Sequence, residues 1–408
     1  MYVRRLELVH FRCYRHLDLA LPPGPVILYG ANAQGKTTLL EAAFVLATTR
    51  APYGVADRLL VHWSASDEVI PYSKVRGEIE RAAGMTTIDV LNVQSAAARG
   101  DERYTKRLRV DDAPRRAMDV IGTLNVVLFT PRDIDLIHGA PAERRRYLDV
   151  LLCQIDPAYV RALGHYNHVV VQRNHLLRRL RDRGGDRREL AVWDEALVAH
   201  GTVILTRRIR AVRELSVLAQ PLHAELVGDD ARLSLTYISR VIGDLDHSGD
   251  VAPVDAASSR APGADEPATA ERFARRIAAR REEEIARGVS LLGPHRDDLQ
   301  LRVGDVDIRT FGSRGQQRTV TLALKLAEAE FMWRTTGERP VLLLDDVLSE
   351  LDRNRRQRLL AHVAAHEQSW ITTTDLDAID ITALGHPHVF EVAQATLTPR
   401  TAGGPAAG

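Results

Sequence analysis

The sequence predicts an α/β fold in which a head built from both ends of the chain carries an α-helical insertion. Three observations indicate this fold. A short buried strand, a glycine-containing loop and a helix follow one another at residues 26–46. A second buried strand, Val341 to Asp346, lies near the other end and finishes in two aspartates. Between them, apolar residues recur at intervals of three, four and seven over residues 141–226, as on one face of an amphipathic helix.

Composition is that of a folded globular protein with two or three domains. The 408 residues are 45% hydrophobic and 27% charged, and no run of about 18 apolar residues offers a membrane span. The first residues lack the apolar core of a signal peptide, so we expect a cytoplasmic protein. Cys13 and Cys153 have no partners at metal-binding spacing, which argues against a zinc site or a disulfide framework. The net charge of +1 gives no overall attraction for nucleic acid, so any DNA affinity must come from local patches.

Residues 1–140 are predicted to form the first part of the head. Alternating or continuous apolar residues predict strands, and the segment after the glycine loop predicts a helix at 36–46. The predicted strands are residues 3–11, 17–21, 26–29, 75–79, 87–93, 108–110 and 126–129.

Residues 141–287 are predicted to form a helical hairpin insertion. One long amphipathic helix runs from Pro141 to Leu180, a turn follows, and a second helix extends from Leu190 to about Leu226. Residues 247–270 are rich in Ala, Pro, Ser, Gly and Asp, which predicts a mobile linker, and a helix follows to about residue 288. We expect residues 288–398 to complete the head and residues 399–408 to form a disordered tail.

The strongest motif is GANAQGKT at residues 30–37, which fits the P-loop pattern G-x-x-x-x-G-K-[ST] between a strand and a helix. In such a loop, backbone N–H groups surround phosphates, Lys36 balances the β- and γ-phosphate charge, and the Thr37 hydroxyl is offered to Mg²⁺. The alternative is a glycine turn that merely caps a helix. The predicted nucleotide contacts are Gly30, Ala31, Asn32, Ala33, Gln34, Gly35, Lys36, Thr37 and Thr38.

The second motif, VLLLDD at residues 341–346, is a buried strand that ends in acids, where α/β sheets hold ligands. Asp345 is predicted to bind Mg²⁺ together with Thr37, and Asp346 to orient or deprotonate an attacking water. The alternative is a buried strand followed by an acidic helix cap.

The third motif, SRGQQ at residues 313–317, precedes a helix and stands just before the acidic strand. This order is found in ATPases that close as dimers around two nucleotides. There, the start of the helix points at the γ-phosphate held by the other subunit, which gives that role to Ser313, Gly315 and Gln316. The alternative is again a glycine turn that caps an amphipathic helix.

These motifs and four further stretches resemble the RecF family of bacterial recombination mediators, which is related to Rad50, SMC and ABC ATPase heads. The resemblance covers nearly the whole chain. The further stretches are LVHFRCYRHLDL at 8–19, VLFTPRDIDLIHGAPAERRRYLD at 127–149, LGPHRDDL at 292–299 and ITTTDL at 371–376. The second of them is the most discriminating, because general ABC ATPases lack it.

The resemblance implies an ABC/Rad50-like P-loop ATPase head that uses ATP and Mg²⁺, with Lys36, Asp345 and Asp346 in catalytic roles. It implies a DNA-binding protein of replication and recombinational repair that binds duplex, gapped and single-stranded DNA and is needed for SOS induction. It also implies an ATP-dependent homodimer whose slow hydrolysis acts as a release switch, and which works with RecR and RecO to load RecA. The sequence departs from the family pattern at Cys13, where Asn is frequent, and at Ala33, where Gly is frequent.

Basic residues suggest where DNA could be contacted. Arg144 and Arg145 lie at the start of the insertion, and Arg178 and Arg179 lie near the tip of the predicted hairpin. Such clusters can neutralise phosphates without reading sequence. For Arg144 and Arg145, the alternative is a structural role where the head meets the insertion. For Arg178 and Arg179, the alternative is that the side chains are simply solvated or paired with acids. His295 and Arg296 could face a ligand, or could be structural.

Two other functions remain open from the sequence. One is the nucleotide-binding subunit of a membrane transporter, although such ATPases close their head without a helical hairpin insertion. The other is a scaffold that binds ATP without turnover, which the retained Asp345 and Asp346 disfavour.

Overall fold

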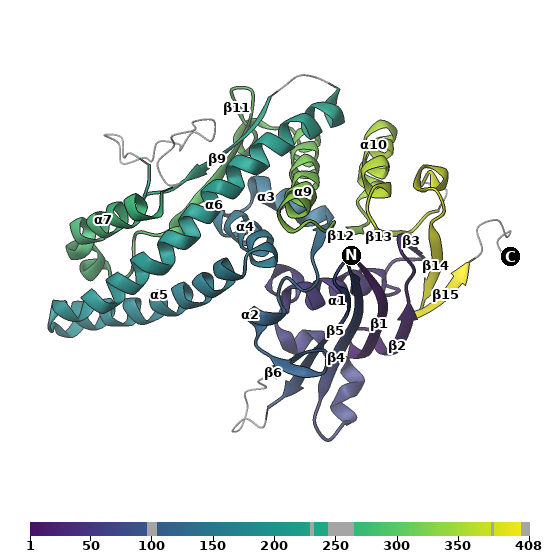
Figure 1. Ribbon diagram of the computed structural model, residues 1–408, viewed down its shortest axis with the longest axis horizontal. Coiled ribbons are helices and arrows are strands. Elements are labelled where there is room, and N and C mark those ends of the chain that lie inside the picture. Colours follow the sequence, from purple (N-terminus) through teal and green to yellow (C-terminus); the bar gives the residue numbers. More distant parts are fainter. Residues whose placement is uncertain (96–103, 229–231, 244–264, 377–378, 401–408) are drawn as a thin grey trace. The chain divides into compact units, whose positions relative to one another are not determined.

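The computed structural model describes residues 1–95, 104–228, 232–243, 265–376 and 379–400 (Figure 1). The chain divides into two compact units, each described here by itself. The head unit comprises residues 1–133 and the chain from 328 onward, and the arm unit comprises residues 134–327. No helix of the described residues combines the length and apolar character needed to cross a membrane.

The head unit contains two six-stranded sheets. The first is antiparallel, in the order β2-β1-β4-β5-β6-β7. In β4, buried and part-exposed residues alternate, because one face packs inward while the other meets solvent. The strands are β1 (Tyr2–Phe11), β2 (Tyr14–Ala20), β4 (Tyr72–Arg81), β5 (Gly84–Gln94), β6 (Tyr104–Val110) and β7 (Ala113–Arg115).

The second sheet joins the two ends of the chain, as the sequence predicted. Its order is β15-β14-β3-β13-β12-β8, parallel except for β15. Strands β12 and β13 are almost wholly buried, which explains their continuous apolar character. The strands are β3 (Gly24–Tyr29), β8 (Val126–Phe129), β12 (Val341–Asp345), β13 (Gln368–Thr373), β14 (His388–Ala393) and β15 (Thr396–Arg400).

Helix α1 (Lys36–Thr48) packs against strands of both sheets, including β4 and β12. The packing is close at Gly77, where an added Cβ would stand 2.6 Å from a methyl group of Leu46. Helix α10 (Arg353–Ala364) contacts β3 of the parallel sheet. The head unit also contains α2 (Ala117–Val120) and short 3-10 turns, among them Pro52–Gly54, Asp57–Leu60 and Trp63–Asp67.

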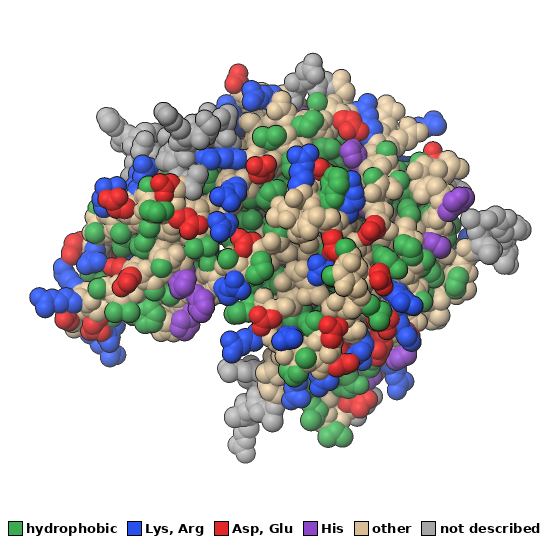
Figure 2. Space-filling model, viewed as in Figure 1, with side chains coloured by type: hydrophobic (Ala, Val, Ile, Leu, Met, Phe, Trp, Pro, Cys, Tyr) green, Lys and Arg blue, Asp and Glu red, His purple; other side chains and the backbone are tan. Residues whose placement is uncertain are grey.

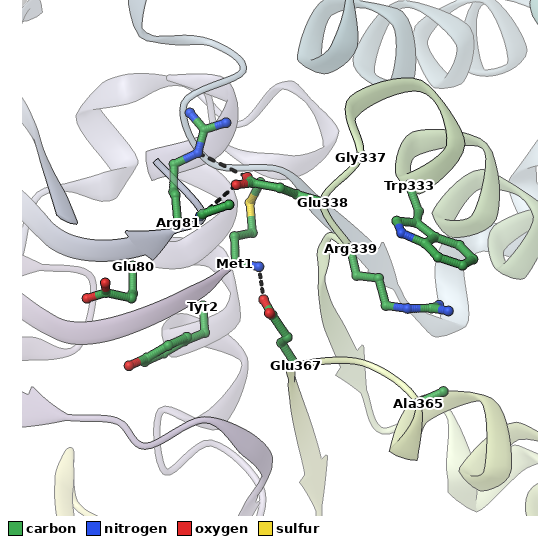
Figure 3. Close-up of a pocket in the computed structure, with 11 residues that line it drawn as sticks. Met1, Tyr2, Glu80, Arg81, Trp333, Gly337, Glu338, Arg339, Ala365 and Glu367 are labelled. Atoms are coloured by element: carbon green, nitrogen blue, oxygen red, sulfur yellow. Dashed lines mark hydrogen bonds and ion pairs between the residues drawn. The ribbon is translucent and has the colours of Figure 1, made fainter. Parts of the chain in front are cut away.

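The two sheets are also linked at the first residues of the chain (Figure 3). The Met1 amine pairs with Glu367, and the Gln368 side chain bonds both the N–H and the carbonyl of Val3, each at 2.9 Å. Beside them, Arg81 donates to Glu338 at 3.1 Å. The Met1–Glu367 and Arg81–Glu338 pairs line a polar pocket of about 450 Å³. Because these opposite charges are already paired with one another, we interpret the pocket as a structural joint.

The arm unit combines long helices with a small antiparallel sheet of order β11-β10-β9. Helices α5 and α6 form the predicted hairpin, and α7 packs on both (Figure 1). Leu176, Leu177, Leu180, Leu190 and Ile285 form a buried cluster between these three helices. The elements are α3 (Asp135–His138), α4 (Pro141–Ile155), α5 (Pro157–Arg183), α6 (Leu190–Val227), β9 (Leu233–Ile238), α7 (Glu266–Arg287), β10 (Asp298–Val303), β11 (Val306–Asp307), α8 (Ile308–Phe311) and the first part of α9 (Arg314–Thr336).

The prediction of one continuous helix from Pro141 to Leu180 is wrong, because the chain breaks at Asp156. This residue is extended, with φ −134° and ψ 100°, as expected before a proline. Its carboxylate accepts hydrogen bonds from the N–H groups of Ala158 at 2.8 Å and Tyr159 at 3.2 Å, which caps α5. The apolar periodicity continues across the break and therefore concealed it.

The units also differ from the predicted domain boundaries. Residues 288–327, predicted to belong to the head, lie in the arm unit, because β10 pairs with β9 inside the predicted insertion. Helix α7 begins at Glu266, inside the predicted linker of 247–270, while residues 247–264 lie outside the described residues. Of the predicted tail, Pro399 and Arg400 lie in β15, and residues 401–408 are outside the described part of the chain.

Candidate nucleotide site

The P-loop motif lies between β3 and α1, as predicted, and its backbone needs unusual dihedral angles. Gly30 has φ +150° and Gly35 has φ +107°. A Cβ at Gly30 would stand 2.3 Å from the Val392 carbonyl oxygen, so only glycine fits there. Ala33 has φ +62°, a left-handed conformation in which glycine is favoured. No side chain caps α1, which leaves the N–H groups of its first turn available to an anion.

Gln34, one of the predicted nucleotide contacts, joins the loop to the turn between β14 and β15. Its side-chain oxygen accepts from the N–H of Gln394 at 2.6 Å, and its carbonyl accepts from Ala395 at 3.2 Å. The Tyr14 hydroxyl donates to the carbonyl of Gly35 at 3.2 Å. The part of the loop next to α1 is therefore held by other residues of the head unit.

Lys36 is buried and directed back at the loop. Its Nζ donates to the carbonyls of Gly30 at 2.6 Å and Ala31 at 2.7 Å. Burial lowers the pKa of Lys36 below its ordinary value, and the carboxylates of Asp346 and Asp345 oppose that shift. A poorly solvated ammonium beside free helix N–H groups provides a strong site for phosphate oxygens.

Asp345 and Thr37 lie together, as predicted, with a third residue that sequence reasoning missed. Asp345 Oδ1 accepts hydrogen bonds from the hydroxyls of Thr37 at 2.8 Å and Thr372 at 2.9 Å. The three residues come from the end of β12, the first turn of α1 and β13. Thr372 belongs to the ITTTDL stretch, where a polar residue near the end of a buried strand was the only available signal.

Asp346 directly follows this cluster in a strained turn. Its φ is +51°, a left-handed angle that a non-glycine residue adopts at a cost on the order of 1 kcal/mol. The Asp346 N–H donates to Thr372 Oγ1 at 2.9 Å, and the Ser349 hydroxyl donates to its carbonyl at 2.8 Å. These two bonds hold the backbone of Asp346 directly after the end of β12.

The SRGQQ motif starts α9 in the arm unit and has its own capping arrangement. The Gln316 side chain accepts from the Ser313 N–H at 2.9 Å, and Ser313 Oγ accepts from the Gln316 N–H at 3.3 Å. Ser313, Gly315 and Gln316 are all exposed. A Cβ at Gly315 would meet nothing within 4 Å, so the packing of this chain does not require a glycine there.

Of the residues predicted to contact DNA, Arg144 is in a position that does not suit that role. Its side chain is about 2% exposed. It bonds both Asp298 oxygens, at 2.6 and 2.9 Å, and the carbonyls of Leu136, Ile137 and Gly139. Arg145 is half-buried and donates to the Asp297 carbonyl at 2.8 Å. Although the sequence here is a run of arginines, the Arg144 and Arg145 side chains donate hydrogen bonds to acceptors within the arm unit.

Arg178 and Arg179 are exposed near the end of α5, but acidic side chains pair with several arginines of this basic cluster. Arg179 pairs with Glu189, and Arg178 donates to the Asn174 carbonyl at 3.1 Å. Arg181 pairs with Asp182 and Arg187 with Glu282. Basic and acidic side chains are interspersed over the arm helices on the face seen in Figure 2.

The GPHRDD segment faces the interior of the arm unit. His295 bonds the Tyr166 hydroxyl at 2.6 Å, and Arg296 donates to the Ser290 carbonyl. Asp297 accepts from the Tyr237 hydroxyl at 2.9 Å. Burial lowers the pKa of His295 to about 4 and raises the pKa of Asp297 to about 7. His295 and Asp297 therefore belong to a largely buried polar network, whereas the Arg296 side chain is exposed.

Comparison with known proteins is decisive for the family. Residues 2–381 match the RecF/RecN/SMC N terminal domain family. The DNA replication and repair protein RecF of Herpetosiphon aurantiacus is 47% identical over 386 residues, which cover 92% of this chain and 94% of that protein. The chain belongs to the RecF family. The RecF protein of Chloroflexus aurantiacus is also 47% identical, over 92% of this chain and 94% of that protein.

Solved structures confirm the predicted fold class. A structure of the recombination mediator protein RecF with ATP, in the RecFOR pathway, has a TM-score of 0.82 at 27% identity and covers 98% of both chains. An Smc head domain from Pyrococcus furiosus has a TM-score of 0.51 at 14% identity, over 98% of this chain and 96% of that one, which supports the fold alone. The RecF fold therefore includes the ABC/Rad50-like head predicted from the motifs.

Proposed function

We propose that this chain is an ATP-dependent DNA-binding protein of DNA replication and recombinational repair, in which ATP acts as a switch. The observation that carries the proposal is the Thr37, Asp345 and Thr372 cluster beside the buried Lys36. It brings a phosphate-binding loop and a fixed carboxylate together from opposite ends of the chain. The RecF structure with ATP supports the choice of nucleotide.

The site suits a magnesium nucleotide. A hydroxyl and a carboxylate are hard oxygen ligands of the kind that Mg²⁺ prefers, and Thr37 and Asp345 would hold it. When bound, Mg²⁺ neutralises charge that develops on the β- and γ-phosphate oxygens. Lys36 binds the same phosphates, Thr372 holds the Asp345 carboxylate in place, and Asp346 would orient or deprotonate the attacking water.

We further propose that the active unit is an ATP-dependent homodimer. The exposed start of α9 would meet the γ-phosphate held by a second copy, through Ser313, Gly315 and Gln316. The free space around Gly315 supports this role, because a glycine with no packing constraint allows a phosphate to approach the backbone. Slow hydrolysis would then separate the copies and release DNA.

The family supports a role in the cytoplasm with DNA, RecR and RecO, in loading RecA at gaps and in SOS induction. The substrates would be duplex, gapped and single-stranded DNA. Arg178 and Arg179 remain proposed contacts, since their exposed side chains could exchange acidic partners for phosphates. Arg144 is not proposed as a contact, because its buried guanidinium holds Asp298.

The proposed contact between the start of α9 and a second copy is tested by Ser313→Arg. A bulky cation at the start of α9 should block the approach of a second copy but leave the P-loop intact. We expect unchanged ATP affinity and loss of ATP-driven dimerisation, measured by analytical ultracentrifugation. Val192→Arg, at a 70% exposed position on α6, is the matched control and should dimerise normally. Normal dimerisation of the Ser313 variant would refute the proposed contact.

The repair role is tested by measuring binding to duplex, single-stranded and gapped DNA with and without ATP. ATP should strengthen binding to at least one of these substrates. Failure to bind any of them would overturn the proposal. ATP turnover with and without gapped DNA separates a switch from a scaffold that binds ATP without hydrolysis.

A further inference from the structure

The exposed face of α5 carries a line of polar side chains at helical spacing. This α5 stripe consists of Arg161, His165, His168, Gln172, His175 and Arg179. With about 3.6 residues per turn, these positions lie within about 40° of one line along the helix. All but Gln172 are exposed, and histidines gather on the arm in the view of Figure 2. At about 1.5 Å per residue, the stripe is about 27 Å long.

This part of the helix contains basic residues and no acids. Residues 157–181 include neither Asp nor Glu, and the first acid, Asp182, pairs with Arg181 beyond the stripe. Helix α7 differs, because Arg275 there pairs with Glu271 one turn away. An ordinary solvated helix face carries charges of both signs in this way. The one-sided composition of the α5 stripe therefore predicts an anionic partner.

Acids on the neighbouring helices contact the other side of α5. Asp149 of α4 accepts a hydrogen bond from the Tyr159 hydroxyl. Asp194 of α6 and Glu284 of α7 accept from the buried Arg173. Tyr159 and Arg173 stand about 120–160° around the helix from the stripe. These carboxylates therefore do not neutralise the stripe.

Among the described residues, His200 and Glu189 touch the stripe from outside α5. The His200 ring stacks on His165 with centroids 5.0 Å apart, and Glu189 pairs with Arg179. The side chains of the other basic members form no hydrogen bond or ion pair within the described part of the chain. Burial lowers the pKa of His200, and His165 lowers it further. His200 therefore stays neutral to a lower pH than a solvated histidine does.

We propose that the α5 stripe binds the phosphate backbone of duplex DNA, and that its histidines tighten this binding as the pH falls. The inference rests on the DNA-binding function proposed above and extends the contact proposed at Arg178 and Arg179 along the helix. Histidine side chains change charge between about pH 8 and pH 5. A length of about 27 Å equals the rise of about eight phosphates of one strand, at about 3.4 Å each. Contacts to phosphates of this kind position a protein on DNA without reading its sequence.

The histidines are tested with a full-length triple variant, His165→Gln, His168→Gln and His175→Gln. Glutamine is polar and forms helices well, but it cannot gain a proton. Binding to a short duplex is measured with ATP at about pH 8 and about pH 6. We expect the parent and the variant to agree within threefold at the higher pH, and the parent to bind about 10-fold more tightly at the lower pH. The slope of log affinity against log salt should steepen in the parent by about 0.9 for each histidine that meets a phosphate.

Matched controls come from elsewhere on the molecule. His388→Gln, at an exposed position of β14 in the head unit, should follow the parent at both pH values. Arg161→Gln should weaken binding at both pH values and reduce the salt slope by about 1. Arg275→Gln, whose guanidinium pairs with Glu271, should change affinity less than threefold. ATP turnover without DNA should be the same in all variants.

The outcomes separate this inference from the proposed function. If the parent binds DNA and the triple and Arg161 variants bind it equally well, the stripe contact is overturned and the function stands. If the parent binds no DNA at either pH, both proposals fall. If DNA binding is unchanged but the triple variant loses binding to a polyglutamate peptide, the stripe takes an acidic protein, which also overturns the DNA contact.

Discussion

At the scale of single residues, the orientation of Asp345 depends on side chains from distant parts of the sequence. Thr37 and Thr372 both donate to Oδ1 of Asp345, and the Thr372 hydroxyl also accepts from the Asp346 N–H. One hydroxyl therefore fixes both acids. A ligand whose orientation is already fixed binds a cation more tightly than one that must be ordered on binding.

Thr372→Val should therefore reduce ATP turnover about 10-fold, with little change in folding. The valine keeps the shape of the side chain but removes the bonds to Asp345 and Asp346. Single-turnover hydrolysis at saturating ATP and varied Mg²⁺ measures the effect, and the Mg²⁺ requirement should rise. Thr372→Ser keeps the hydroxyl and should restore both values. Wild-type turnover in Thr372→Val would contradict the positioning role.

Burial dominates the chemistry of Asp297. Its pKa is raised to about 7 because burial disfavours the charge, although the Tyr237 hydroxyl and the guanidinium of Arg208 oppose the shift. In the unfolded chain the pKa of an aspartate is about 4. The folded protein therefore binds more protons between about pH 4 and 7. The contribution of Asp297 to stability is fully present below about pH 4 and is lost as pH rises toward 7.

Asp297→Asn should remove this pH dependence. The free energy of unfolding of the wild-type chain should fall relative to the variant by up to about 1.4 kcal/mol per pH unit between pH 5 and 7. Urea denaturation of both proteins at several pH values measures the difference. His295, which titrates in the opposite sense, is present in both and cancels. A difference that stays constant from pH 5 to 8 would mean that the carboxylate is ionised throughout.

At the scale of elements, local signals predicted β3, α1, β12 and the hairpin of α5 and α6. Each has a strong period or a loop with a distinctive residue pattern. The break at Asp156 was missed because apolar spacing continues through it. The pairing of β9 with β10 was missed because nothing local relates two segments separated by a helix. The burial of Arg144 was missed for the same reason, since its partner Asp298 lies far along the chain.

The cap at Asp156 is expected to stabilise the arm unit. Its carboxylate holds two N–H groups of α5 and pairs with Arg207 at 2.9 Å. Asp156→Ala should lower the free energy of unfolding by about 1–2 kcal/mol, measured by urea denaturation. Asp265→Ala, at the start of α7, is the matched control, because that exposed cap makes one longer bond of 3.4 Å. Its loss should be about 0.5 kcal/mol, and equal losses would argue against the account of Asp156.

At the scale of the whole molecule, the two halves of the proposed ATP site lie in different units of the chain. The P-loop and Asp345 belong to the head unit, and Ser313 belongs to the arm unit. Helix α9 begins beside Ser313 in the arm and ends at Thr336 in the head. Dimer closure around ATP would therefore engage both units of each copy, which gives nucleotide binding a means to act on a DNA surface elsewhere.

Such coupling must be reciprocal. If ATP tightens binding to gapped DNA by a given factor, gapped DNA must tighten ATP binding by the same factor, and coupling in proteins is typically about 5- to 150-fold. Titrations of each ligand in the presence of the other, in an Asp346→Asn background without turnover, measure both factors. Ser313→Arg should reduce both to about 1 while each ligand still binds, because closure is the step that links them. If the variant shows the same coupling factors as the parent protein, ATP binding affects DNA binding within a single copy. The dimer would then not be the switch.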